Sequence, residues 1–147
     1  MKLVEKLNSI FSMDDEVEKE NAIEAIGDIL EYGGLDTNEI IEGVNSLISY
    51  VVLEKNDTLK ESILHTINNA IVYQNVAAEI SLDVFIPYIS SLKVEYLTYV
   101  ISFLGFSGNH KYVPILETFL IHPSKEIQEA AKEALSEIKY RNSNIKE

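Results

Sequence analysis

The sequence predicts an all-α protein, organised as an α-solenoid of about four helical hairpins. Apolar residues recur at i, i+3, i+4 and i+7 through nearly all of the 147 residues, and no alternation typical of a β-strand persists. Similar helices also recur, because the anchor positions Ile26, Ile71, Leu104 and Leu135 follow one another at intervals of 45, 33 and 31 residues. Periods of this size are typical of stacked helical hairpins.

The first two hairpins are bounded by clear turn signals. The apolar pattern predicts helices over residues 2–12 and 14–32, followed by the helix-end signal Gly33-Gly34. It predicts the next pair over residues 37–54 and 58–76, divided at Asn56-Asp57. Short turns between such helices make antiparallel hairpins the expected arrangement.

The third and fourth hairpins follow the same pattern. Helices are expected over residues 82–91 and 93–106, with a helix-end signal at Gly108-Asn109. The last pair is expected over residues 111–121 and 124–140, divided at Pro123-Ser124. Ser124 is suited to cap the final helix, because a serine side chain can accept a hydrogen bond from a free backbone N–H of the first turn.

The second helices of the hairpins resemble one another. The segment "AIEAIGDI" (22–29) aligns with "AKEALSEI" (131–138), while "VISFLGF" (100–106) places Leu104-Gly105 on Ile26-Gly27. The segment "INNAIVY" (67–73) supplies Ala70-Ile71 at the same place. We therefore expect Ile26, Ile71, Leu104 and Leu135 to be buried at equivalent positions, and Ala131 and Ala134 to lie where helices approach closely.

The last unit, "KYVPILETFLIHPSKEIQEAAKEALSEI", resembles a HEAT repeat. It has an early proline in its first helix and an alanine-rich second helix, and "VFIPYISSL" (84–92) repeats the proline-bearing first helix. It departs from the family in having Gln128 where an arginine is common and in lacking the usual turn aspartate. The resemblance implies a right-handed solenoid forming a single domain over residues 1–147; an irregular helical bundle is the alternative.

The charge argues against nucleic acid as a partner. The chain has 24 acidic and 12 basic residues, a formal net charge of -12, and Arg141 is its only arginine. A field of this sign repels phosphate backbones. The excess is concentrated at the start, since residues 1–45 contain 12 acidic residues and three lysines.

The remaining composition indicates a cytoplasmic protein. The chain has no cysteine, which excludes disulfides and thiolate metal sites and suits a reducing compartment. Its first residues, "MKLVEKLNSIFSMDDEVEKE", lack the apolar core of a signal peptide, and no run approaches the ~18 apolar residues of a membrane span.

The sequence contains no recognisable catalytic or metal-binding motif. His65, His110 and His122 are scattered and form no HExxH or i, i+4 pair. Glu133 and Glu137 lie one helical turn apart, but such pairs are common on exposed helices. The sequence therefore predicts a non-enzyme without a cofactor or metal ion.

The resemblance to HEAT stacks implies where a protein partner binds. In that family the second helices form the concave wall, so residues off their apolar stripe should face the partner. The expected partner-binding residues are Glu24, Asp28, Glu31, Asn69, Tyr73, Ser102, Phe106, Glu133 and Glu137. The alternative is that the aromatic rings are packing residues and the glutamates a solvated face.

Two functional interpretations follow. A small, acidic, cysteine-free helical protein is similar in character to the bacterial immunity proteins that bind and neutralise a cognate toxin, often a basic nuclease. The alternative is a HEAT-type scaffold or adaptor that binds a peptide or helix in its concave groove. Either interpretation implies a protein partner and no membrane, and a HEAT-type DNA-repair protein is disfavoured because it would need a basic groove.

Overall fold

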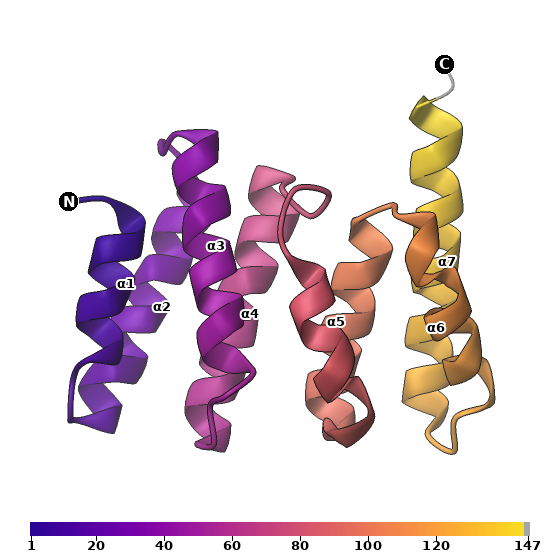
Figure 1. The fold of residues 1–147 in the computed structure, drawn as a ribbon, viewed down its shortest axis with the longest axis horizontal. Helices are drawn as coiled ribbons and strands as arrows, with labels where there is room; N and C mark the ends of the chain where they lie inside the picture. The colour runs from indigo at the N-terminus through magenta and orange to yellow at the C-terminus, as the bar shows by residue number, and fades with distance from the viewer. Residues whose placement is uncertain (146–147) are drawn as a thin grey trace. The chain divides into compact units, whose positions relative to one another are not determined.

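A computed structural model describes residues 1–145, with side chains through residue 143. Within this range the backbone forms seven α-helices, three 3₁₀ segments and connecting turns, with no β-strand (Figure 1). The expected all-α class is therefore confirmed. No helix of the described chain combines the length and the apolar character that crossing a bilayer requires.

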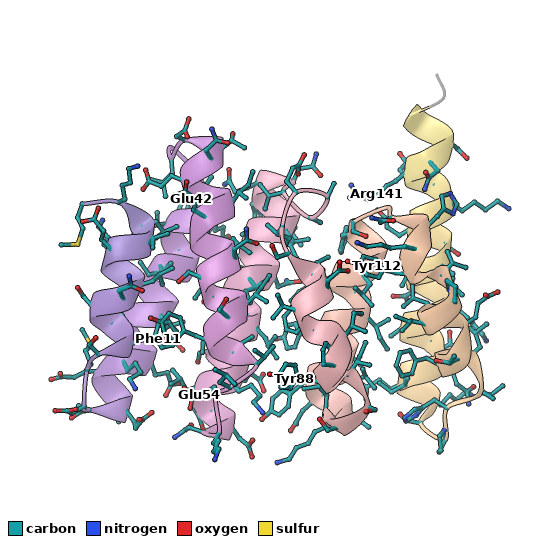
Figure 2. All side chains as sticks on the ribbon, viewed as in Figure 1. Phe11, Glu42, Glu54, Tyr88, Tyr112 and Arg141 are labelled. Atoms are coloured by element: carbon teal, nitrogen blue, oxygen red, sulfur yellow. The ribbon has the colours of Figure 1, made fainter. Side chains whose placement is uncertain are left out.

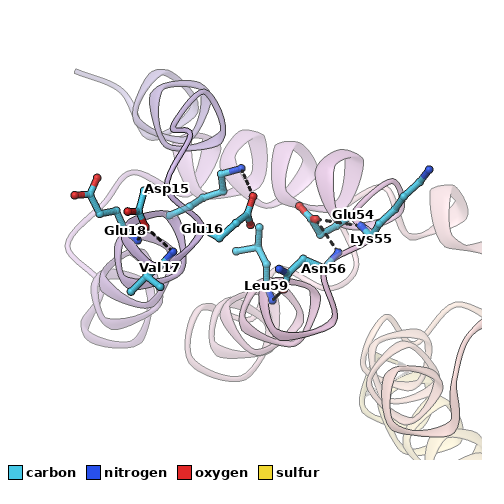
Figure 3. A network of polar contacts seen from close by, with 9 residues as sticks. Asp15, Glu16, Val17, Glu18, Glu54, Lys55, Asn56 and Leu59 are labelled. Atoms are coloured by element: carbon cyan, nitrogen blue, oxygen red, sulfur yellow. Dashed lines mark hydrogen bonds and ion pairs between the residues drawn. The ribbon is translucent and has the colours of Figure 1, made fainter.

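The chain divides into two compact units, Met1–Phe85 and a second unit that begins at Ile86. Unit 1 contains α1 (Leu3–Phe11), α2 (Glu16–Tyr32), α3 (Thr37–Val51) and α4 (Asp57–Gln74). These bounds lie within three residues of the predicted ones, because local signals set them. Figure 3 includes two of the N-caps: the Asp15 carboxylate accepts hydrogen bonds from the backbone N–H groups of Val17 and Glu18, and Asn56 Oδ1 accepts one from Leu59.

Unit 1 is built from two layers of helices. Figure 1 shows α1 beside α3 in one layer and α2 beside α4 in the layer behind, and the helix contacts agree. Phe11 of α1, labelled in Figure 2, stacks on Tyr50 of α3, and the ring centroids are 3.8 Å apart. The Tyr50 hydroxyl donates to Asn8 Oδ1 at 3.0 Å. Each hairpin therefore buries its apolar stripe against its neighbour.

Unit 2 contains shorter and less regular elements. The 3₁₀ helix η1 (Leu82–Ser91) starts in unit 1 and leads to α5 (Val94–Phe106). The helix predicted over 111–121 is divided into η2 (His110–Tyr112), α6 (Val113–Thr118) and η3 (Phe119–Ile121). The last helix, α7 (Lys125–Ile145), packs on α5, α6 and η3 and continues beyond the predicted end at residue 140.

The predicted anchors are correct in three of four cases. Ile26, Ile71 and Leu104 are buried, but Leu135 is only partly buried. In α7 the buried positions are Ile127, Ala131, Ala134 and Ile138, and in α2 they are Ile23, Ile26, Gly27 and Leu30. The burial pattern thus matches Ala131, Ala134 and Ile138 with Ile23, Ile26 and Leu30, one residue away from the predicted alignment. Ala131 and Ala134 are buried as expected.

Candidate functional site

The predicted partner-binding residues form two separate groups, one in each unit. Glu24, Asp28, Glu31, Asn69 and Tyr73 lie on α2 and α4 of unit 1. Ser102, Phe106, Glu133 and Glu137 lie on α5 and α7 of unit 2, where all four line one groove.

The two units differ sharply in charge. Residues 1–85 contain 17 acidic and five basic residues, whereas residues 86–147 contain seven of each. The whole formal charge of -12 therefore belongs to unit 1. The field of unit 1 would attract a positively charged molecule, while unit 2 carries no net formal charge.

A polar seam, formed by Thr66, Asn69 and Gln74 of α4, joins this helix to α2. Asn69 Nδ2 donates to the carbonyl of Gly27 at 3.2 Å, and Gln74 Nε2 to that of Leu30 at 2.6 Å. The single Thr66 hydroxyl proton is shared between the Ser62 carbonyl of α4, at 2.8 Å, and the Ile23 carbonyl of α2, at 3.3 Å. These bonds require close approach. A Cβ at position 27 would lie 3.2 Å from Thr66 Oγ1, so the glycine leaves room for the α4 side chains at this contact.

A row of carboxylates on α2 runs beside this seam. Glu20, Glu24, Asp28 and Glu31 are spaced by three or four residues and so share one face of the helix. Ser62 Oγ on α4 donates to Glu20 Oε1 at 3.4 Å, which places the row next to the α2–α4 contact. Glu24 and Asp28 are exposed to solvent and available to a partner.

Asn69 and Tyr73 occupy different environments. Asn69 is only 9% exposed and serves the seam, so a partner would reach little of it. Tyr73 is 55% exposed, as an anchoring ring would need to be. Tyr32, at the end of α2, is 86% exposed, and the contact of Gln74 with Leu30 and Gly33 brings the ends of α2 and α4 together. Tyr32 was not among the predicted partner-binding residues, although its position just before Gly33-Gly34 marks it as a helix-end residue.

In unit 2 a groove of about 300 Å³ runs between α5 and α7. Its α5 wall consists of Thr98, Ser102 and Phe106, and its α7 wall consists of Ala130, Glu133, Ala134 and Glu137. Both sets repeat at three- or four-residue spacing, which gives each helix one continuous wall. The helices touch at Gly105, where an added Cβ would lie 2.7 Å from the Ala134 Cα atom.

One end of the groove already holds a cation from the chain itself. Arg141 Nε lies 2.9 Å from Glu137 Oε1, and its guanidinium carbon lies 5.3 Å from the centroid of the Phe106 ring. The side chain of Asn142 donates to the carbonyls of Gly108 and Ile138, at 2.8 and 2.7 Å, which ties α7 to the turn after α5. The i, i+4 spacing of Glu137 and Arg141 was the available sequence signal for this pair.

The histidines are dispersed over the surface. His65 and His110 are exposed, and His122 Nδ1 accepts a hydrogen bond from the Ser124 backbone N–H at 2.9 Å. Among the side chains that the structure describes, no three His, Asp or Glu residues are placed to hold a metal ion. The surface features that remain are the acidic row, the exposed tyrosines and the groove.

The chain matches no model of a known protein family, and a search of curated protein sequences also finds no match.

Proposed function

We propose that this chain is a non-catalytic, cytoplasmic protein-binding module that recognises a basic protein partner. In this proposal its hairpins form a right-handed, HEAT-like α-solenoid over residues 1–147. The observation that carries the proposal is the confinement of the entire net charge of -12 to residues 1–85, with carboxylates aligned on the accessible face of α2.

Different residues are expected to attract the basic partner and to hold it once bound. A concentrated negative field raises the association rate of a basic protein, and this effect weakens as salt screens the charges. Exposed tyrosines provide large apolar area together with a hydroxyl, and such residues supply much of the binding energy at protein interfaces. Glu24 and Asp28 are therefore assigned to steering, and Tyr73 to anchoring.

The specific form of this proposal is an immunity protein that neutralises a cognate basic, nuclease-type bacterial toxin. A nuclease domain needs a positively charged cleft to hold phosphates. An acidic protein bound over that cleft would repel nucleic acid and block its path to the active site. The acidic unit supports this form of the proposal, while the groove between α5 and α7 of unit 2 favours a second candidate, an adaptor that holds a peptide or helix.

Binding kinetics with a partner purified from the native host test the proposal. The variant Glu24→Lys/Asp28→Lys should associate more slowly, with a flatter salt dependence, because steering is reduced. Tyr73→Ala should dissociate faster and lose about 2 kcal/mol if the ring is a central anchor. Glu117→Lys/Glu126→Lys, on α6 and α7 in unit 2, reverses two exposed carboxylates away from α2 and serves as the control of equal charge change.

Three results would contradict the assignment. They are binding that is independent of salt, an association rate equally affected by the Glu117/Glu126 control, and normal dissociation of the Tyr73 variant. The choice between inhibitor and adaptor depends on the partner's own activity. An immunity protein abolishes a toxic nuclease activity at one-to-one stoichiometry, whereas an adaptor leaves its ligand active.

A further inference from the structure

The groove between α5 and α7 combines three features that suit one kind of occupant. Its floor, where α5 and α7 approach each other, is lined by the small side chains of Ala130 and Ala134, its α5 wall offers the hydroxyls of Thr98 and Ser102, and its α7 wall carries two carboxylates. Thr98 and Phe106 are eight residues apart on α5, so the groove extends roughly 12 Å along this helix. That length fits three or four extended residues of a peptide, at about 3.3 Å each.

We propose that this groove receives one lysine or arginine side chain from the protein partner. The proposal rests on the protein-binding function proposed above and adds the chemistry of the contact. The aliphatic stem of the basic side chain packs on the alanine floor, and its charged head lies between Glu133 and the α5 hydroxyls. The volume of about 300 Å³ is at the low end of the range for ligand pockets, as expected for a single inserted side chain.

Charge complementarity selects a basic occupant over the alternatives. An apolar side chain in the groove would remove water from the Glu133 carboxylate without giving it a partner, which is costly. An acidic side chain would add direct repulsion. Glu133 is exposed and makes no ion pair with any residue in the described part of the chain, so its carboxylate is available to a cation from outside.

Arg141 provides an internal precedent for this recognition. At the end of the same groove its guanidinium already lies against the Phe106 ring and pairs with Glu137. The groove residues thus bind a cation through one carboxylate and one aromatic ring within this molecule. Glu133, one turn earlier on α7, offers the next carboxylate along the wall at a point where the described residues supply no cation.

Nuclear magnetic resonance with defined peptides tests the proposal on the full chain. The probes are the capped tripeptides Ala-Lys-Ala and Ala-Arg-Ala, with Ala-norleucine-Ala as an uncharged control of similar shape. A single basic side chain should bind weakly, with a Kd of about 1–10 mM. We expect the basic peptides to shift the amide signals of Ser102, Ala130 and Ala134, and the norleucine peptide to leave them unchanged.

Two variants with the same charge change identify the carboxylate. Glu133→Gln should weaken binding of the lysine peptide roughly 3- to 5-fold, the effect of losing one partly exposed ion pair. Glu117→Gln, on α6, should leave the affinity unchanged, because Glu117 does not line the groove. Equal shifts with norleucine, unaltered affinity in the Glu133 variant, or no groove shifts at about 20 mM peptide would overturn the proposal.

A hexalysine peptide separates this inference from the proposed function. If the acidic unit recruits basic partners, hexalysine should shift amides along α2, including those of Glu24 and Asp28. Shifts on α2 without shifts in the groove would overturn the groove proposal and leave the acidic surface intact. Shifts in the groove alone would support the groove proposal and refute the role assigned to the α2 carboxylates.

Discussion

Substituting Gly105 by alanine tests the closest helix contact in unit 2. An added Cβ would lie 2.7 Å from the Ala134 Cα and 2.9 Å from its Cβ, so α5 and α7 must move apart. Overpacking of this kind costs about 1–3 kcal/mol. Alanine is a better helix former than glycine by about 0.5–1 kcal/mol, which offsets part of the loss. Because the added Cβ meets backbone, the cost lies in the upper half of that range, and the expected net destabilisation is about 1–2 kcal/mol.

Thermal unfolding followed by circular dichroism measures this loss. For a chain of this size, 1–2 kcal/mol corresponds to a decrease in Tm of roughly 2–8 °C. Ala134→Gly in the same background should restore only part of the stability, because it removes the contact with Cβ but leaves the contact with Cα. Gly105→Ala with wild-type or higher stability would refute the close approach of α5 and α7.

Gly27→Ala is the matched comparison in unit 1. There the added Cβ would meet the ends of two side chains, at 3.2 Å from Thr66 Oγ1 and 3.3 Å from Asn69 Nδ2. Side chains can shift by a few tenths of an ångström, and the gain in helix propensity compensates. The free energy of unfolding of this variant should remain within about 1 kcal/mol of the wild-type value. The two substitutions are predicted to differ because Gly105 faces the backbone of Ala134, whereas Gly27 faces the ends of side chains.

Leucine at Ala131 or Ala134 should cost about 1–3 kcal/mol by overpacking, and unchanged Tm values in both variants would show that these alanines do not control packing. Asp15→Ala should lower stability by about 1 kcal/mol, because the cap of α2 is lost, while Asp14→Ala should have little effect in the same urea titration. Asn69→Ala should cost about 0.5–1.5 kcal/mol in urea unfolding, because one interhelical hydrogen bond is removed. A larger loss would mean that the polar seam acts cooperatively, and no loss would mean that it is replaced by water.

The helix ends were predictable because their causes are local. Asp15, Asp36 and Asn56 each bond to backbone N–H groups within three residues, and Gly33 adopts a positive φ of 82° that favours glycine. The 3₁₀ geometry of η1, η2 and η3 was not predictable. Repeats of 3.0 and 3.6 residues cannot be distinguished over such short segments.

The candidate site was predictable in part. The sequence predicted one partner-binding surface of nine residues, and four of them, Ser102, Phe106, Glu133 and Glu137, line the groove between α5 and α7. Their role in binding a partner stays a prediction. Asn69 was predicted to face a partner but is buried, because α2 comes close to it at Gly27 and accepts its hydrogen bond. From the sequence alone, a polar side chain on a helix is expected to be exposed, because a hydrogen-bond partner on another helix is not visible.

The sequence by itself determined the helical class, the positions of most helix ends and the acidity of the first half of the chain. These properties depend on local hydrogen bonds, on the period of apolar residues and on composition. Only the tertiary structure decided which side of each stripe is most deeply buried. The contact of Gly105 with Ala134 turns Ala131, Ala134 and Ile138 inward and leaves Leu135 partly exposed, because helix orientation is set by the residues that approach across an interface.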